Sequence, residues 1–176
     1  MTTIATAPSR THVTVDSPVG PLTLVAAGGA LAGLYMEAQR HLPGTAAFGV
    51  PGDPAGEPFA SAARQLGDYF EGRLTRFELD LDPAGTPFQR RVWLALRDIP
   101  YGQTVSYGEL AASIGAPAAS RAVGLANGKN PISIVVPCHR VVGSDGSLTG
   151  YGGGLDRKRF LLDLEQGAGR LITATD

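Results

Sequence analysis

The period of the hydrophobic pattern changes near residue 86, and this change limits the folds open to the chain. In the first half, residues 12–16 alternate polar with apolar, and residues 21–27 and 31–36 also predict strands, with Pro- and Gly-containing turns between these segments. A period of two is typical of half-buried strands, and such short turns favour antiparallel pairing. We therefore expect the chain to begin with an antiparallel meander.

The rest of the first half adds one helix. Residues 59–71 carry apolar side chains at helical spacing, and 77–81 alternates again and predicts a further strand. Residues 40–58 are rich in Pro and Gly and predict a long loop. We read 82–85 as a linker between domains.

The second half carries two helix start signals. Thr86, with Gln89 three residues later, forms a capping box that predicts a helix over 87–97. Ser106 and Glu109 form a second box, which predicts a helix that runs to residue 114.

The turn that follows, 115–117, contains Gly115 and Pro117 and predicts a second short helix over 117–127. Two short helices joined by such a turn are a helix-turn-helix, although many helical hairpins share the pattern. A β-branched run then covers 132–136, and 144–147 is a hairpin-turn signal. A last helix is predicted over 155–165, with Phe160, Leu161 and Leu164 facing inward.

We therefore expect an α/β N-terminal domain of antiparallel strands plus a helix, followed by a mostly helical, winged helix-turn-helix-like C-terminal domain. The expected divisions are a flexible tail at 1–11, the first domain at 12–84 and the second at 85–170. No apolar run is long enough for a transmembrane helix, and no secretory signal or nucleotide-binding glycine motif is present. The expected location is the reducing cytoplasm.

Charge is divided unevenly between the two halves. The whole chain has a net charge of −1, but residues 1–85 carry −4 and residues 86–176 carry +3. A basic half points modestly to an anionic partner, whereas two solvated surfaces that merely differ would explain the same counts. On charge alone the second explanation is favoured.

The chain has one cysteine, Cys138, followed by His139 and Arg140. A neighbouring His or Arg lowers the pKa of a thiol from about 8.5 and makes it a nucleophile, but a free Cys is more often a buried structural residue. From the spacing alone, a nucleophilic Cys138 and a buried structural Cys138 are equally supported. An orienting carboxylate could come from several acidic residues downstream, namely Asp145, Asp156, Asp163 and Glu165. A single Cys and three scattered His residues predict no metal site.

The sequence NPISIVVPCHRV at 130–141 resembles the signature of the O6-alkylguanine-DNA alkyltransferases. The likeness extends through SYGELA at 106–111, RAVG at 121–124, NG at 127–128 and LTGYGGG at 148–154, and on to Lys158 and Glu165. It covers residues 86–166 strongly and the first half only in outline. The resemblance implies direct transfer of an alkyl group from O6 of guanine, and less readily from O4 of thymine, to the protein's own cysteine, once per molecule.

The resemblance also implies a role for each matching residue. Cys138 would be the alkyl acceptor, His139 the base acting through a bound water, Glu165 its orienting partner and Tyr107 the proton donor to the leaving guanine. Arg121 would fill the gap left by the flipped base. The remaining DNA contacts would come from Ser106, Ala119, Ala122 and Gly124. The substrate pocket would be formed by Asn130, Val141, Tyr151, Gly152, Gly153 and Lys158.

The implied partner is double-stranded DNA containing O6-alkylguanine, bound through the minor groove, whose degenerate code suits a protein that must act in any sequence. We expect no cofactor, no membrane and a monomer, with cooperative clustering on DNA left open. The N-terminal half would be a scaffold without chemistry of its own. Two rivals are a DNA-binding module of the alkyltransferase-like kind, which lacks the acceptor cysteine, and a Cys-His-Glu hydrolase that turns over.

Overall fold

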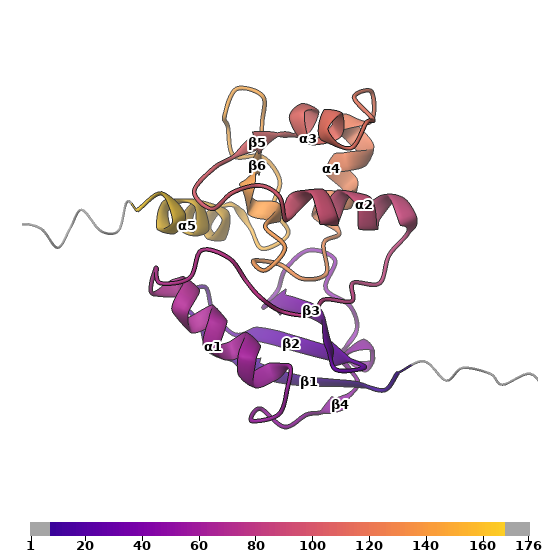
Figure 1. The fold of residues 1–176 in the computed structure, drawn as a ribbon, viewed down its shortest axis with the longest axis vertical. Coiled ribbons are helices and arrows are strands. Elements are labelled where there is room, and N and C mark those ends of the chain that lie inside the picture. Colours follow the sequence, from indigo (N-terminus) through magenta and orange to yellow (C-terminus); the bar gives the residue numbers. More distant parts are fainter. Residues whose placement is uncertain (1–7, 168–176) are drawn as a thin grey trace, which may run out of the picture.

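The N-terminal half forms a four-stranded sheet with one long helix on it, and the C-terminal half forms a helical layer beside it (Figure 1). The computed structural model describes residues 8–167. Strands β1 (Arg10–Val15), β2 (Leu22–Ala27) and β3 (Ala30–Met36) form the expected antiparallel meander. Strand β1 begins inside the range expected for the tail.

Two expectations for the N-terminal half are wrong. Residues 40–58 are not one loop, because they contain the 3₁₀ helix η1 (Thr45–Phe48) and strand β4 (Val50–Pro51), which pairs in parallel with β1. Residues 77–81 are not a strand. Only Leu81 makes a ladder contact, with Leu31, while the Gln65 side chain bonds the backbone of Glu78 and takes the place of a strand partner.

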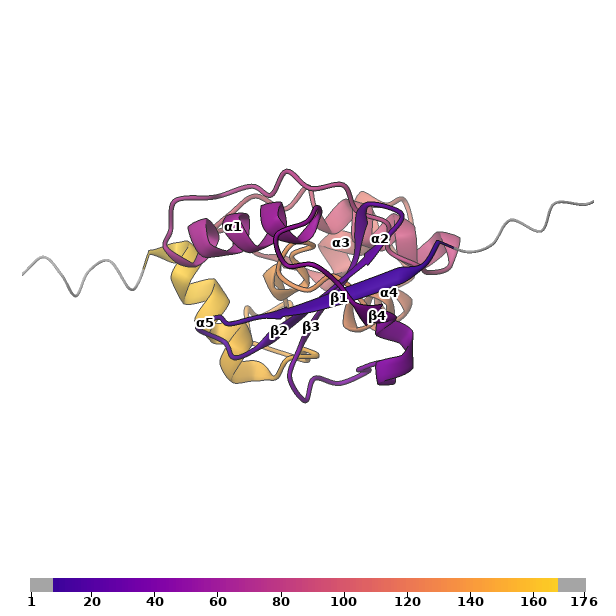
Figure 2. The ribbon, with the colours of Figure 1, turned by 90° about the horizontal axis from the view of Figure 1, so that it is seen from below.

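Helix α1 (Phe59–Phe70) forms where its spacing predicts and packs its apolar face against the sheet. Phe59, Ala62, Leu66 and Tyr69 are buried along that face. Figures 1 and 2 both place α1 close to the last helix of the chain, α5 (Leu155–Gln166). The end of the N-terminal helix therefore lies against the C-terminal layer.

The helices of the second half start at their capping residues. The Thr86 box caps α2 (Pro87–Leu96), and the Ser106 box caps α3 (Tyr107–Ser113), which follows the two-residue strand β5 (Val105–Ser106). Helix α4 runs over Ser120–Gly128, so the expectation that Pro117 starts it is wrong. Gly115 takes a φ of +73°, and the turn continues to Ala119 before helical bonding begins.

The segment between α4 and α5 is irregular and holds the lone cysteine. The β-branched run 132–136 forms turns, and Ile134 has a φ of +71°. A 3₁₀ turn, η2 (Cys138–Arg140), leads into strand β6 (Val141–Val142), which pairs in parallel with β5. The 144–147 turn forms, but it joins no hairpin. On α5, Leu161 is buried, whereas Phe160 is 39% exposed, which corrects its expected inward position.

One hydrophobic core runs through both halves. Leu34 of β3 bonds Pro131 and pairs with Ile132, so the edge of the N-terminal sheet continues into the cysteine segment. The indole of Trp93 on α2 donates to the carbonyl of Ala126 on α4 and locks these two helices together. The shared core means that the N-terminal sheet supports the cysteine segment directly.

Candidate active site

The turn that carries Cys138 is held by two buried asparagines. Asn130 donates from Nδ2 to the carbonyl of Val136 at 2.8 Å and accepts from the backbone N–H of Ile132 at 3.0 Å. Asn127 of α4 donates to the carbonyl of Cys138 at 3.4 Å. The Asn127 bond joins the helix-turn-helix to the cysteine turn, whereas the Asn130 bonds hold the segment that leads into this turn.

The Cys138 thiol is buried, with 5% of the residue exposed. Burial raises its pKa, while the Asn130 side chain and the Lys158 charge oppose the rise. Of the two interpretations that the spacing left open for Cys138, the structure shows the burial, and His139 and Arg140 both bond the Glu165 carboxylate rather than the thiol. A neutral thiol needs a base before it can attack a carbon atom.

His139 is fully buried and has one bonded ring nitrogen. Its Nε2 lies 2.7 Å from Oε1 of Glu165, and its Nδ1 has no partner among the described residues. Burial lowers the pKa of His139, although Glu165 opposes this. Because an ionised carboxylate can only accept, we assign the proton of the neutral ring to Nε2, which leaves a lone pair on Nδ1. His139 therefore has one ring nitrogen that is free to accept a proton.

The Glu165 carboxylate is the centre of the buried polar network. Arg140 donates from Nε to Oε2 and from Nη2 to Oε1, both at 2.9 Å, and the backbone N–H of Gly102 lies 3.3 Å from Oε2. Burial raises the pKa of Glu165, but the hydrogen bonds from His139 and Arg140 outweigh it and lower the pKa to about 2. The carboxylate is therefore ionised at neutral pH.

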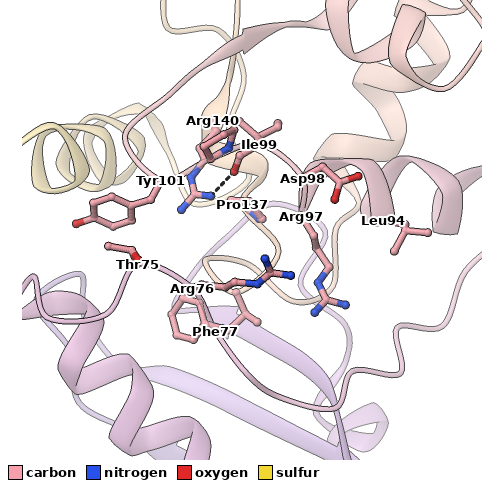
Figure 3. Close-up of a pocket in the computed structure, with 12 residues that line it drawn as sticks. Thr75, Arg76, Phe77, Leu94, Arg97, Asp98, Ile99, Tyr101, Pro137 and Arg140 are labelled. Carbon is pink, nitrogen blue, oxygen red and sulfur yellow. Dashed lines mark hydrogen bonds between the residues drawn. The ribbon is translucent and has the colours of Figure 1, made fainter.

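Arg140 also fixes the cysteine turn from its other side. Its Nη1 donates to the carbonyl of Ile99 at 2.7 Å, and its guanidinium lies over the ring of Tyr101 (Figure 3). The pocket drawn there, of about 490 Å³, reaches Pro137 and Arg140 but contains none of the predicted site residues. The Cys138 side chain is not part of it.

Lys158 of α5 ties the chain on either side of the turn at 144–147. Its Nζ donates to the carbonyls of Val141 at 2.5 Å, Thr149 at 2.9 Å and Gly150 at 3.4 Å. Burial lowers the pKa of Lys158 to about 8, although Cys138 opposes this. Lys158 thus holds the start of the glycine loop against the strand that follows the cysteine.

A second pocket, of about 200 Å³, lies beside the helix-turn-helix. Four predicted site residues line it, namely Tyr107, Gly124, Tyr151 and Gly152. The Tyr107 hydroxyl donates to the carbonyl of Thr149 at 3.2 Å, and the Tyr151 hydroxyl is buried without a partner among the described residues. Cys138 does not line this pocket, and neither do Asn130, Val141, Gly153 and Lys158.

The glycines of this loop allow close packing. A Cβ on Gly153 would lie 2.5 Å from the sulfur of Met36, and the carbonyl of Gly152 accepts the backbone N–H of Arg40 at 2.7 Å. The N-terminal domain therefore contacts the wall of the pocket.

The expected DNA contacts lie at the surface of α3 and α4. Arg121 and Ala122 are exposed at the start of α4, and no hydrogen bond or ion pair joins the Arg121 side chain to the described residues. Ala119 is the residue before α4, and Ser106 is committed to its capping box. Gly124 faces Tyr107, so a Cβ there would touch the tyrosine ring.

Three contributors to the site escaped the sequence analysis. Tyr69 donates to Glu165 from the N-terminal domain, Arg140 holds both carboxylate oxygens, and Asn127 bonds the cysteine turn. The PCHR motif did point to Arg140, but as a partner of the thiol. Nothing near Tyr69 in the sequence distinguishes it from other apolar positions of an amphipathic helix.

Taken together, the fold and the site define a helix-turn-helix protein with a buried thiol beside a histidine whose ring is held by a carboxylate. Two family models cover most of the chain. The 6-O-methylguanine DNA methyltransferase ribonuclease-like domain matches residues 11–83, and the DNA binding domain of the same family matches residues 87–167. The chain therefore belongs to the 6-O-methylguanine DNA methyltransferase family, which confirms the resemblance seen in the sequence.

Known relatives cover nearly the whole chain. A Mycobacterium tuberculosis protein named methylated-DNA–protein-cysteine methyltransferase is 58% identical over 153 residues, 87% of this chain and 90% of that protein. A Methanosarcina barkeri protein of the same name is 51% identical over 86% of this chain and 94% of its own length. The crystal structure of Mycobacterium tuberculosis OGT in complex with DNA matches with a TM-score of 0.82 and 55% identity, covering 89% of this chain and 93% of that one. The expected two-domain fold is confirmed by these matches.

Within residues 8–167, no group of three His, Cys, Asp or Glu side chains is placed to hold a metal ion. Across the same residues, no helix is long and apolar enough to cross a membrane.

Proposed function

We propose that this protein repairs DNA by moving an alkyl group from O6 of guanine to Sγ of Cys138, once per molecule. The observation that carries the proposal is the unpartnered, buried Nδ1 of His139, because Glu165 fixes the ring with this nitrogen as a free acceptor. The relatives named methylated-DNA–protein-cysteine methyltransferase support the same reaction. O4-alkylthymine is a slower substrate.

The reaction begins with loss of the thiol proton. Nδ1 of His139 takes this proton through a bound water, and Glu165 stabilises the imidazolium that results. The thiolate then attacks the alkyl carbon, so that a carbon–sulfur bond forms as the carbon–oxygen bond breaks. The electron pair of the broken bond goes to the guanine.

Tyr107 supplies the proton that makes guanine a good leaving group. Its hydroxyl rests on the carbonyl of Thr149 and lines the pocket together with Tyr151 and Gly152. A guanine that enters this pocket displaces the weak contact and receives the proton of Tyr107 on a ring nitrogen. Tyr107 then regains a proton from solvent as the imidazolium of His139 releases one, so the only net proton transfer is from the thiol to guanine.

Cys138, Val141 and Gly153 do not line this pocket in the structure, so the bound guanine would have to reach past it to main-chain groups near Cys138 and Val141. Lys158 holds the Gly150 end of the pocket, and Asn130 holds the segment that leads to Cys138.

The substrate is double-stranded DNA, contacted through the minor groove by α4. A relative solved with DNA supports this partner. The small residues Ala119, Ala122 and Gly124 permit close approach of the helix, Ser106 lies at the start of α3, and Arg121 is free to enter the duplex where the damaged base has left. The protein acts as a monomer in the reducing cytoplasm, where its single thiol stays available.

Mass spectrometry of the Cys138 peptide tests the reaction. Incubation with a duplex containing O6-methylguanine should add one methyl group to that peptide and consume one thiol per molecule. The Cys138→Ser variant is the matched control and should bind the duplex without demethylating it. An unmodified Cys138 peptide, or more than one turnover per molecule, would sink the proposal and favour the hydrolase.

Arg121→Ala tests the intercalating role. We expect a larger loss in transfer rate from duplex O6-methylguanine than from the free base O6-benzylguanine, because only the duplex requires base flipping. Arg64→Ala on α1 removes another exposed guanidinium and should leave both rates unchanged. Equal losses on both substrates would remove the role from Arg121.

A further inference from the structure

Tyr69 reaches the candidate active site from the N-terminal domain. Its hydroxyl donates to Oε1 of Glu165 at 2.8 Å across 96 positions of sequence, and the residue is 1% exposed. Its ring contacts three aromatic rings, those of Phe70, Phe77 and Tyr101, at centroid distances of 5.3, 5.3 and 6.2 Å. The hydroxyl is therefore held in one direction by packing.

The tyrosine and the histidine share one carboxylate oxygen. Oε1 of Glu165 receives the Tyr69 hydroxyl, Nε2 of His139 and Nη2 of Arg140, whereas Oε2 receives Nε of Arg140 and the N–H of Gly102. A carboxylate oxygen has about two lone-pair sites, so three donors on Oε1 compete with one another. Each donor weakens the pull of that oxygen on the other two.

We propose that Tyr69 is a positioning residue for alkyl transfer, which fixes the Glu165 carboxylate and limits how strongly it stabilises a protonated His139. This inference rests on the proposed function, in which neutral His139 accepts the thiol proton. It also replaces the expectation that the N-terminal half is a scaffold without chemistry of its own.

The groups that face His139 and Glu165 decide whether loss of the Tyr69 hydroxyl raises or lowers the pKa of His139. They are the cations of Arg140 and Lys158 and the hydroxyls of Tyr69 and Tyr151. The ring of Tyr101 lies against Arg140, and the thiol of Cys138 interacts with Lys158 and Tyr151. Burial raises the pKa of the Tyr69 hydroxyl, and the Glu165 charge raises it further, so the hydroxyl keeps its proton and always donates. Removal of this donor leaves more carboxylate charge to stabilise the imidazolium, and the pKa of His139 rises.

Histidine NMR on the full chain measures this directly, because the chain contains only three histidines. His12→Gln and His41→Gln identify the His139 signals. In Tyr69→Phe we expect the midpoint of the His139 titration to rise by about half a pH unit to one pH unit. This is the size of pKa shift that loss of one charge-assisted hydrogen bond produces. Identical His139 spectra for wild type and Tyr69→Phe over the whole pH range of folding would overturn the inference.

Two further variants test whether the Tyr69 hydroxyl acts on His139 or Tyr69 only supports the fold. Tyr35→Phe removes the hydroxyl of another buried tyrosine of the same domain, one that packs with Val25 and Phe48, and should leave His139 unchanged. 3-Fluorotyrosine introduced at position 69 keeps the shape of the ring but is a stronger donor, so it should move the midpoint of His139 downward. If Tyr69→Phe does not fold, a fluorotyrosine protein with the wild-type midpoint would overturn the inference by itself.

The pH profile of methyl transfer from duplex O6-methylguanine is the functional readout. Tyr69→Phe should be slower than wild type by about threefold to tenfold below its raised midpoint and should converge with wild type at higher pH. A loss that is equal at every pH would mean a structural role only and would contradict the inference. If no protein transfers an alkyl group, the proposed function fails, while the NMR comparison still decides the role of Tyr69.

Discussion

Lys158 offers a test in which stability should rise with pH. The residue is fully buried on α5, and its ammonium is surrounded by three neutral carbonyls, of Val141, Thr149 and Gly150. No carboxylate bonds it among residues 8–167. Lys158→Met keeps much of the side chain's length and apolar stem but removes both the charge and the donors.

The magnitude follows from the two pKa values of Lys158. Burial lowers the pKa to about 8 in the folded protein, against 10.5 in the unfolded chain. Between these values the unfolded state binds more protons, so the free energy of unfolding rises with pH. From pH 7 to pH 9.5 this single group contributes a gain of about 2 kcal/mol. At pH 7 the two proteins should be close in stability, because loss of the hydrogen bonds offsets relief of the buried charge.

Urea unfolding of wild type and Lys158→Met at several values between pH 7 and pH 9.5 provides the measurement. Because the charge of Lys158 affects the pKa of Cys138, both proteins should carry Cys138→Ser. The buried tyrosines titrate in the opposite sense in both proteins, so the difference between the two free energies is the relevant quantity. That difference should grow in favour of wild type by about 2 kcal/mol as pH rises. Parallel curves would refute the reasoning and place a normal, solvated ammonium at position 158.

Two other substitutions probe the framework of the site. Asn130→Ala should lower the free energy of unfolding by about 3 kcal/mol, because it leaves the carbonyl of Val136 and the N–H of Ile132 buried without their partner. A loss under about 1 kcal/mol in urea unfolding would show that these groups find other partners. Thr86→Ala removes the side-chain acceptor that caps α2 and should lower the free energy of unfolding by about 1 kcal/mol. Thr86→Ser keeps the acceptor and should be as stable as wild type. Equal losses in both variants would contradict the capping role.

Local rules predicted most of the fold. Both capping boxes formed at Thr86 and Ser106, because a cap needs only residues three positions apart. The errors fall where distant groups decide the outcome. Residues 77–81 alternate like a strand, but the side chain of Gln65 on α1 bonds both backbone groups of Glu78. Phe160 has the right spacing to face inward, yet the fold gives the buried position on α5 to Lys158.

In the candidate site, too, the sequence predicts the residues of a local motif and misses those brought in by distant contacts. The PCHR motif located Cys138 and His139 without any structure, and the resemblance supplied Glu165 as the carboxylate. The spacing alone left four carboxylates open, because 26 positions separate His139 from its partner. Tyr69 could not be found, because its role depends on the docking of α1 against α5, which no local pattern encodes.

The burial of Cys138 changes how its reactivity is controlled. A thiol activated by a lowered pKa would be ionised at all times and open to stray oxidation, whereas burial raises the pKa of Cys138 and keeps it neutral. A thiol of high pKa is also the stronger nucleophile once it has lost its proton. On the proposed mechanism, control would then pass to His139, whose free Nδ1 would accept the proton from within the site. We expect iodoacetamide to label folded wild type more slowly at pH 7 than the urea-unfolded chain, in which Cys138 has an ordinary pKa. Faster labelling of the folded protein would mean that the resting cysteine is already a thiolate, and the base would then be unnecessary.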